Sequence, residues 1–385
     1  MKASTKKARI IALYLPQFHP IPENDAWWGK GFTEWTNVAQ TRPLFKGHYQ
    51  PRIPADLGFY DLRLPEIREQ QAMLAKEAGI EAFCYYHYWF GGKQLLERPL
   101  NEVVQSGKPD FPFCICWANH TWSSATWTAS GKKSSILMEQ TYPGKEDHIA
   151  HFKALLPAFK DQRYYTIEGR LVFTIYDPFA FPQVGDFMRL WNELAKAEGL
   201  PGFYFIAMVP STLTFDPQTH QKQIPNLKSS AALYNYALQL GFDAVNSFGK
   251  RRGELLEKGM TRSMINRILG MLHLNIHAET YNYPSTVANY FAPEDSWENV
   301  YPTILPQWDR TPRNGSREGI YINSTPEAFE QHIRHALSII SHKQAEHQIL
   351  FLKSWNEWGE GNYVEPDLKY GHQWLDAIKN AINND

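Results

Sequence analysis

The segment 354–361, with the sequence SWNEWGEG, carries two carboxylates three residues apart, Glu357 and Glu360. Glycoside chemistry requires such a pair, because one carboxyl protonates the leaving oxygen while the other, ionised, creates or becomes the nucleophile. The alternative is that both glutamates are solvated loop residues or ion-pair partners. The flanking residues Trp355 and Trp358 favour the catalytic interpretation, since they place the pair on an aromatic strand end rather than in an open loop.

Other polar and aromatic side chains follow the apolar runs of the chain in the same way. Such a set predicts a glycan pocket, because sugar hydroxyls need hydrogen-bonding groups and the CH faces of pyranose rings lie flat on aromatic rings. The aromatic content supports this prediction, with 13 Trp, 20 Tyr and 22 Phe making 14% of the chain. The candidate substrate-binding residues are Gln17, His19, Trp28, Glu34, Trp35, His87, Trp89, Asn119, His120, Trp122, Asp177, Trp308, Asp309, Asn356 and Trp358.

Several of these candidates have a structural alternative. His87 could be a core histidine whose hydrogen bonds are satisfied within the protein. Trp28 and Trp35, in the long loop after the first expected strand, could form a structural cluster. Glu34 is therefore the stronger indication that this loop binds substrate. Asp309 and Arg313 could hold substrate, but we expect them to pair with each other and fix their loop. Lys250 to Arg252 form a charge run that is most simply solvated.

Two further clusters have a spacing that can serve metal binding. Cys114 and Cys116 lie on one face of an apolar run, but two thiols are too few for a zinc site, and we predict that they are core residues. His273 and His277 are four residues apart on a predicted helix without the glutamate of an H-E-x-x-H motif, which indicates a surface pair. We therefore expect no metal and no cofactor.

Eight short apolar runs alternate with longer amphipathic stretches, the pattern of β-α units around a parallel sheet. The sequence predicts a (β/α)8 barrel in one domain, residues 8–382, with extended βα loops and an insertion at about 246–300. A doubly wound open sheet is the alternative, but the chain has no G-x-G-x-x-G turn and no P-loop. The expected strands are 10–15, 80–86, 111–117, 171–176, 203–209, 242–245, 303–305 and 349–355. The expected helices are 64–78, 94–106, 147–159, 184–198, 229–240, 326–342 and 368–382.

The overall composition excludes several classes of partner. With 39 Lys and Arg against 40 Asp and Glu, the chain has no basic surplus for a nucleic-acid backbone. No apolar run approaches the roughly 20 residues that span a membrane. The run 10–15 follows a basic start but is too short for a signal peptide, so we interpret it as a strand. Three cysteines are few and odd in number, which makes the reducing cytoplasm the expected compartment.

Five motifs carry a resemblance to a known family: 14–20 (YLPQFHP), 27–35 (WWGKGFTEW), 83–90 (FCYYHYWF), 116–122 (CWANHTW) and 355–361 (WNEWGEG). Over residues 8–376 the chain resembles the WbsX-type family, which is labelled glycosyltransferase and is associated with O-antigen and capsule polysaccharides. It is also similar to glycoside hydrolase family 99, the endo-α-mannosidases.

The resemblance implies a metal-independent (β/α)8 barrel that cleaves or transfers α-linked sugars with retention, and we expect it to act on the α-linked glycans of a bacterial polysaccharide. It also implies that Glu357 removes the proton of the sugar 2-hydroxyl, which closes a 1,2-anhydro intermediate. Glu360 then matches the residue that protonates the leaving oxygen and later activates water. As the acid beside a second carboxylate, Glu360 is expected to have a raised pKa.

Two other functions compete with hydrolysis. The family label indicates a glycosyltransferase of O-antigen or capsule biosynthesis, although the chain has no D-x-D motif and the eight-unit pattern disfavours paired nucleotide-binding domains. A non-catalytic glycan-binding barrel is the third possibility, but binding alone does not require the pair Glu357 and Glu360. The sequence leaves the oligomeric state undetermined.

Overall fold

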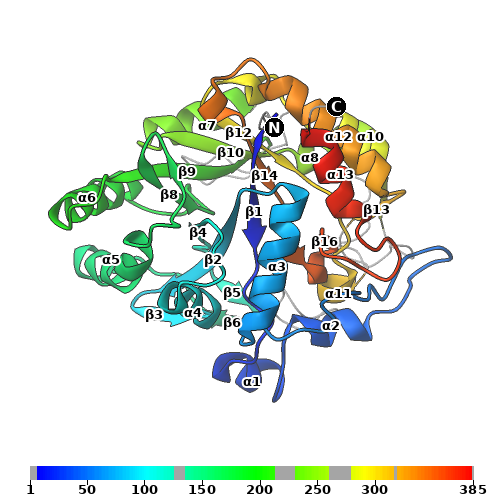
Figure 1. Ribbon diagram of the computed structural model, residues 1–385, viewed down its shortest axis with the longest axis horizontal. Helices are drawn as coiled ribbons and strands as arrows, with labels where there is room; N and C mark the ends of the chain where they lie inside the picture. The colour runs from blue at the N-terminus through cyan, green and yellow to red at the C-terminus, as the bar shows by residue number, and fades with distance from the viewer. Residues whose placement is uncertain (1–6, 125–134, 213–229, 260–278, 316–318, 384–385) are drawn as a thin grey trace, which may run out of the picture.

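The computed structural model describes residues 7–124, 135–212, 230–259, 279–315 and 319–383. Eight parallel strands close a barrel, because β1 pairs with both the last strand, β14, and the second, β2. Figure 1 shows the helices arranged around this sheet. The predicted (β/α)8 barrel is confirmed, and the closure excludes the open doubly wound sheet. In sheet order the barrel strands are β1 (Arg9–Tyr14), β14 (Ile349–Leu352), β12 (Val300–Ile304), β10 (Ala244–Phe248), β9 (Phe203–Pro210), β8 (Arg170–Ile175), β4 (Phe113–Trp117) and β2 (Ala82–Phe90).

The outer layer consists of helices that follow the strands. Seven of them correspond to the amphipathic stretches expected from the sequence, and Gly79 and Gly199 have the positive φ expected beyond a helix end. These helices are α3 (Pro65–Ala78), α4 (Arg98–Ser106), α5 (Lys145–Phe159), α6 (Val184–Ala197), α7 (Ser230–Gln239), α12 (Pro326–Ile340) and α13 (Gln373–Ile382). The helix expected over 94–106 starts later, because β3 (Lys93–Leu95) first folds back on β2.

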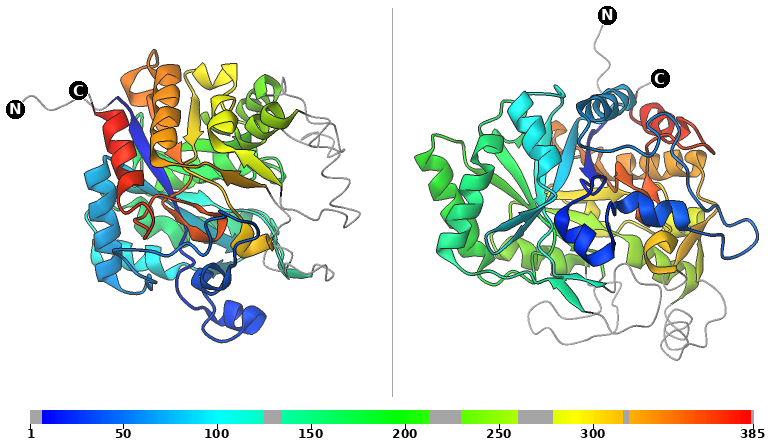
Figure 2. Two further views of the ribbon diagram at one scale, coloured as in Figure 1. Left: turned by 90° about the vertical axis from the view of Figure 1, so that its right-hand side faces the viewer. Right: turned by 90° about the horizontal axis from the view of Figure 1, so that it is seen from below.

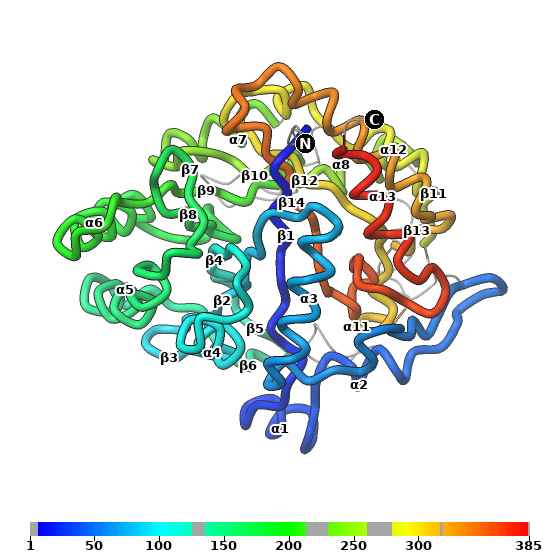
Figure 3. Tube along the Cα trace, in the orientation of Figure 1, coloured from blue at the N-terminus to red at the C-terminus, as the bar shows by residue number. Residues whose placement is uncertain are grey.

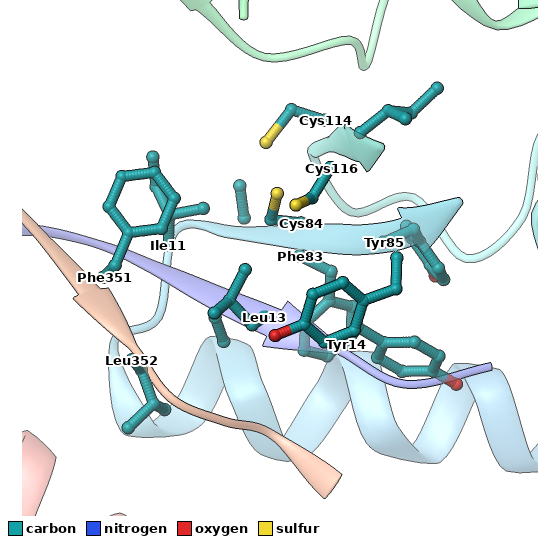
Figure 4. Packing of buried hydrophobic residues seen from close by; sticks show 14 of the residues in the cluster. Ile11, Leu13, Tyr14, Phe83, Cys84, Tyr85, Cys114, Cys116, Phe351 and Leu352 are labelled. Carbon is teal, nitrogen blue, oxygen red and sulfur yellow. The ribbon is translucent and has the colours of Figure 1, made fainter. Parts of the chain in front are cut away.

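The barrel interior is apolar, since the parallel strands are buried on both faces. All nine residues of β2 are buried. Cys84, Cys114 and Cys116 lie in this interior with their sulfurs close together (Figure 4), and all three are free thiols with no exposed surface. The predicted core position of Cys114 and Cys116 is confirmed.

The loops at the carboxyl ends of the strands carry most of the additional structure. The first loop contains α1 (Pro22–Trp28) and α2 (Glu34–Gln40), and a long segment between α2 and α3 extends towards α11 (Thr311–Asn314) (Figure 3). The expected insertion at 246–300 contains α8 (Lys250–Lys258), β11 (Thr280–Asn282) and α10 (Tyr283–Ala288), and β11 pairs with β13 (Ile320–Ile322). His273 and His277 lie outside the described residues.

The first strand begins beside the last helix, where the Lys7 amide donates to the Ile382 carbonyl at 3.0 Å. Figure 2 shows β1 and α13 next to each other on this side of the molecule. None of the helices within the described ranges is both long and apolar enough to cross a membrane.

Candidate active site

A cavity of about 520 Å³ opens at the carboxyl ends of the barrel strands. This is the end at which βα loops build the active sites of such barrels. Both Glu357 and Glu360 line the cavity, and each of these two residues is buried to more than nine-tenths. Of the other candidates named from the sequence, the cavity brings together Gln17, Trp28, His120, Trp122, Asp177 and Trp308.

The two glutamates lie on a short hairpin that follows β14. It consists of β15 (Asn356–Glu357), the turn η5 (Trp358–Glu360) and β16 (Asn362–Tyr363). The Asn356 side chain accepts from the Leu15 amide at 2.7 Å and donates to the Leu15 carbonyl at 3.0 Å. The Trp358 ring stacks on Tyr363 at 3.7 Å, and its Nε1 donates to Glu365 Oε2 at 2.7 Å. The two Asn356 bonds fix the hairpin to the end of β1, and the Trp358 contacts hold the hairpin together.

A single buried guanidinium joins three carboxylates at the base of the cavity. Arg313 donates from Nε to Glu34 Oε1 at 2.8 Å, and from Nη1 to Glu357 Oε1 at 3.3 Å and Glu360 Oε1 at 2.5 Å. Glu357 and Glu360 therefore contact the same nitrogen atom of Arg313, which keeps their nearest carboxylate oxygens close together.

The expected pairing of Asp309 with Arg313 is wrong. Asp309 Oδ2 instead accepts from His48 Nε2 at 2.8 Å and Gln50 Nε2 at 2.7 Å, and Oδ1 accepts from the Thr311 amide at 3.0 Å. Burial acts to raise the pKa of Asp309, but the His48 hydrogen bond and the charge of Arg52 lower it to about 2. Asp309 is therefore an ionised anchor between the α2–α3 segment and the loop that carries Arg313.

The charges around Glu360 determine its protonation. Burial favours the neutral acid, but the positive charges of Arg310, Arg313 and Lys353 outweigh it and hold the pKa of Glu360 well below its ordinary range. Arg310 Nε lies 3.1 Å from Glu360 Oε1. The expectation of a raised pKa for Glu360 is wrong in this structure, because the three cations outweigh both burial and the neighbouring carboxylate.

Glu34 does not line the cavity but lies directly behind the glutamate hairpin. It has no exposed surface, and burial raises its pKa against the opposing charge of Arg313. A Cβ atom on Gly359 would overlap the Glu34 carboxylate and would lie 3.0 Å from Arg313 Nε. Because Gly359 has no side chain, the space between Glu357 and Glu360 stays open for the side chains of Glu34 and Arg313.

Replacement of this glycine tests the arrangement. We expect Gly359→Ala to displace Glu34 and Arg313 and to lower kcat/KM by roughly 100-fold, since a shift of about 1 Å at a reacting group has effects of that size. Turnover is measured on a substrate of the wild-type protein, with near-ultraviolet circular dichroism as the control for folding. A folded Gly359→Ala protein with wild-type kcat/KM would contradict this account of Gly359.

The cavity has two kinds of wall. On the side of β1, β2 and β4, hydrogen-bonding and stacking groups face it, among them Gln17, Trp28 and Trp122, together with Tyr86 and Tyr88. On the side of β8 to β12 the lining is mainly apolar, with Pro178, Phe179, Met208, Val209, Pro210, Phe248 and Trp308. A pyranose ring placed between these walls has aromatic faces for its CH groups and polar groups for its hydroxyls.

Comparison with known proteins identifies the family. Residues 10–378 match the family described as glycosyltransferase WbsX. The chain belongs to this family. The uncharacterised WxcX proteins of two strains of Xanthomonas campestris pv. campestris are each 33% identical over 381 residues, which is 98% of this chain and 50% of each relative. The chain thus spans about half the length of these relatives. The description of the family is that of a carbohydrate-active enzyme.

Solved structures support the fold. One, described as a glycoside hydrolase-like protein, aligns with a TM-score of 0.59 at 15% identity, over 100% of this chain and 96% of that one. The GH99 endo-alpha-mannosidase from Bacteroides thetaiotaomicron aligns with a TM-score of 0.51 at 15% identity, over 97% of this chain and 95% of that one. At this identity the likeness extends to the barrel and not to the reaction.

Three histidine and tryptophan candidates of this WbsX-family chain lie away from the cavity. The Nε2 atoms of His87 and His151 are 2.8 Å apart, and burial lowers the pKa of His87 to about 3. Trp89 stacks on His151 at 4.7 Å and donates to Asp147 Oδ1 at 3.0 Å. His19 is buried, and burial lowers its pKa to about 4. His87 is thus a buried core histidine that contacts His151, as in the alternative to substrate binding given above.

The remaining candidates support the lining residues from behind. Asn119 braces a lining residue, because its Nδ2 donates to the Asp177 carbonyl and its Oδ1 accepts from the Asp177 amide, both at 2.8 Å. Trp35 packs against Trp358 with ring centres 5.4 Å apart and donates to the Tyr60 carbonyl. The candidates that do not line the cavity are His19, Glu34, Trp35, His87, Trp89, Asn119, Asp309, Asn356 and Trp358.

Sequence reasoning missed several residues of the lining. The expected strands 80–86 and 349–355 contain Tyr86 and Lys353. In the structure β14 ends at Leu352, before Lys353, and the side chain of Tyr86 faces the cavity from within β2. Their polar character at the carboxyl end of an apolar run was a signal that could have found them. Arg310 carried no such signal, because its place depends on the loop held by Asp309. The missed lining residues with polar groups are Tyr86, Tyr88, Ser123, Tyr176, Arg310 and Lys353.

Proposed function

We propose that this chain is a retaining glycoside hydrolase, endo-α-mannosidase-like, that acts on α-linked glycans of a bacterial polysaccharide. The observation that carries the proposal is the pair Glu357 and Glu360, which face one cavity of about 520 Å³ at the catalytic end of the barrel. The alternative that these glutamates are solvated loop residues does not fit their burial. Both carry ion pairs, but with cations that line the same cavity.

The spacing of the pair supports retention. Both glutamates contact the same nitrogen of Arg313, at 3.3 and 2.5 Å, so their nearest oxygens are close. Inverting enzymes separate their carboxyl groups by about 6.5–9.5 Å to admit a water molecule, whereas retaining enzymes hold them about 5–5.5 Å apart. The shared guanidinium favours the shorter separation.

In the proposed reaction Glu357 removes the proton of the sugar 2-hydroxyl, and the 2-oxygen attacks the anomeric carbon. The bond to the leaving oxygen breaks as Glu360 donates its proton there. Water activated by the Glu360 carboxylate then opens the 1,2-anhydro ring, and the 2-oxygen recovers a proton from Glu357. Trp28 and Trp122 line the cavity and offer stacking faces for sugar rings.

The cations around Glu360 give this proposal a distinctive pH dependence. Because they hold the pKa of Glu360 below its ordinary range, its acid form becomes scarcer as the pH rises. We expect kcat/KM to increase as the pH falls towards the acid range. Arg310→Met, which removes a guanidinium 3.1 Å from Glu360, is expected to move the basic limb of kcat/KM to higher pH.

The measurement is a pH profile of kcat/KM for wild type and Arg310→Met, with Arg189→Met as the control because Arg189 is exposed and distant from the cavity. A basic limb that stays in place in Arg310→Met, or moves to lower pH, would refute the acid role of Glu360.

The second candidate function is a glycosyltransferase of O-antigen or capsule biosynthesis. The family description favours it, and Arg310, Arg313 and Lys353 are cations that suit a phosphate-bearing donor. These three cations are already paired with Glu34, Glu357 and Glu360, which leaves no surplus positive charge for a diphosphate among the three cations that the described part of the chain contributes to the cavity. This balance makes hydrolysis our first proposal.

The deciding experiment incubates the protein with α-linked manno-oligosaccharides, other α-linked oligosaccharides and the surface polysaccharide of the host, with and without nucleotide sugars. Release of reducing ends without a nucleotide, absent in Glu357→Gln and Glu360→Gln, supports hydrolysis. Product growth that depends on a nucleotide sugar would support transfer instead. The cytoplasmic location expected from the cysteines stays a prediction, which fractionation of the host tests.

A further inference from the structure

Lys353 is the first residue beyond β14, and it extends a buried ammonium group into the cavity. Its Nζ lies 3.5 Å from Glu357 Oε2 and donates to the Tyr86 hydroxyl at 3.3 Å. The two glutamates and Lys353 thus reach the cavity from one continuous segment, with Lys353 four residues before Glu357. The proposed reaction above assigns no task to this lysine.

Three aromatic rings hold the ammonium in place. Nζ lies 5.9 Å from the ring centres of Tyr86 and Tyr176 and 5.5 Å from that of Phe248. These rings come from β2, from the end of β8 and from β10. A cation surrounded by aromatic faces gains from the ring quadrupoles and has little contact with water. Its interaction with a neighbouring carboxylate is therefore weakly screened.

The charges of the site balance only if Lys353 is counted. Arg313 contacts Glu34, Glu357 and Glu360, and Arg310 contacts Glu360. These two guanidinium groups face three buried carboxylates, and Lys353 supplies the third positive charge. Lys250 is 2.7 Å from Glu254, outside this group.

The two oxygens of Glu357 have different surroundings. Oε1 accepts from Arg313, whereas Oε2 is buried and has no hydrogen-bond partner among the described residues. Lys353 is the cation beside Oε2, at ion-pair distance rather than hydrogen-bond distance. An oxygen in this position lies beside a positive charge yet keeps its lone pairs for a substrate proton.

We propose that Lys353 is a positioning residue that keeps Glu357 ionised and keeps its Oε2 available to take the proton of the sugar 2-hydroxyl. The inference rests on the proposed function for the identity of that proton, but the charge coupling between Lys353 and Glu357 is independent of it. Lys353 itself is a stable cation, since burial acts to lower its pKa but the neighbouring Glu357, Tyr176 and Glu360 side chains outweigh burial and raise it.

Other titratable groups face Lys353 from the surrounding strands and loops, and they bear on any pH dependence. They are Tyr86 on β2, Cys116 on β4, His120 after β4, Tyr176 after β8, Arg313 on α11, and Glu357 and Glu360 on the hairpin. The tyrosine hydroxyls and Cys116 have raised pKa values and stay neutral across the working range, and His120 has its pKa lowered to about 4. Lys353 also acts on Tyr176, Cys116 and His120, but these three groups stay neutral, so the glutamates are the groups whose charge the lysine stabilises.

The test compares Lys353→Met, which removes the charge, with Lys353→Arg, which keeps a cation. For Lys353→Met we expect kcat to fall by at least about 10-fold with KM changed much less, and the acid limb of the pH profile to rise by about 1–3 pH units. Lys353→Arg is expected to keep the acid limb of wild type. Lys369→Met is the matched control, because Lys369 is also a lysine beside two aromatic rings, Tyr49 and Tyr370, but is exposed and outside the cavity.

A second measurement does not depend on turnover. In protein labelled with carbon-13 at glutamate Cδ, the Glu357 signal is assigned by its loss in Glu357→Gln, and the pH at which it takes up a proton is compared between variants. A rise of about 1–3 pH units in Lys353→Met supports the proposal. An unchanged midpoint overturns it, even if the wild type releases no reducing ends and the proposed function fails. If Lys353→Met does not fold, a folded Lys353→Arg protein with a shifted midpoint overturns it.

Discussion

Replacement of Arg313 by methionine is expected to lower the free energy of unfolding by about 3–5 kcal/mol, the range observed when one partner of a buried ion pair is removed. The physical reason is that Glu34 has no exposed surface and accepts a hydrogen bond from Arg313 Nε at 2.8 Å. Glu357 and Glu360 both accept from Nη1 of the same guanidinium. Without the guanidinium, three carboxylates remain together in a region of low polarity. The measurement is urea unfolding followed by tryptophan fluorescence.

The size of this loss should depend on pH. The pKa of Glu34 is already raised by burial, and removal of Arg313 raises it further. A carboxyl with a raised folded-state pKa favours the fold when it is protonated, and this contribution is lost as the pH rises through the folded-state pKa. The deficit of Arg313→Met is therefore largest at neutral pH and above, and decreases as the pH falls towards the ordinary range of carboxyl groups.

Two further variants isolate the ion pair. Glu34→Gln combined with Arg313→Met is expected to recover part of the lost stability, because it removes one of the uncompensated charges. Arg189→Met breaks an exposed pair with Asp186 and should cost no more than about 1 kcal/mol. If Arg313→Met were as mild as Arg189→Met, the three carboxylates would not depend on this guanidinium for their stability.

The barrel was predictable from the sequence because its signals are local. Apolar runs such as 10–15 and 203–209 are long enough to mark buried parallel strands, and glycines such as Gly79 mark helix ends. Each of the eight expected runs overlaps a barrel strand. The boundaries were less accurate where a strand continues into a polar or aromatic stretch, as in β2, which runs to Phe90.

The site was predictable only in part, because its support is not local. Glu357, Glu360 and Trp122 follow strands directly, so their common cavity could be expected from the barrel alone. Arg313 reaches the glutamates through a loop that Asp309 anchors, and Asp309 is itself held by His48 and Gln50, which are 261 and 259 positions away from it in the chain. The low pKa of Glu360 is caused by the charges of Arg310, Arg313 and Lys353. These three residues lie outside the segment 354–361, so the spacing within that segment does not indicate them.

Glu357→Gln is expected to lose about 100- to 10,000-fold in kcat while it still binds the substrate, because general-base catalysis contributes an effect of that size. The amide has nearly the shape of the carboxylate, so the contacts of the sugar with Trp28 and Trp122 remain. Binding of a manno-oligosaccharide to the variant is measured by calorimetry, and turnover by release of reducing ends. A variant that loses binding and turnover together would indicate a binding role for Glu357.

The choice between a base and a direct nucleophile rests on the sugar 2-hydroxyl. If Glu357 Oε2 takes the proton of that hydroxyl, a 2-deoxy or 2-fluoro substrate offers no proton and is not turned over. If Glu357 attacks the anomeric carbon instead, a 2-fluoro sugar with a good leaving group forms a stable ester with it. The position of Lys353 favours the base, because Oε2 lies 3.5 Å from the ammonium without a hydrogen bond that would have to break. Mass spectrometry of the protein after incubation with the 2-fluoro substrate separates the two, and an adduct on Glu357 would replace the 1,2-anhydro route by ordinary two-step retention.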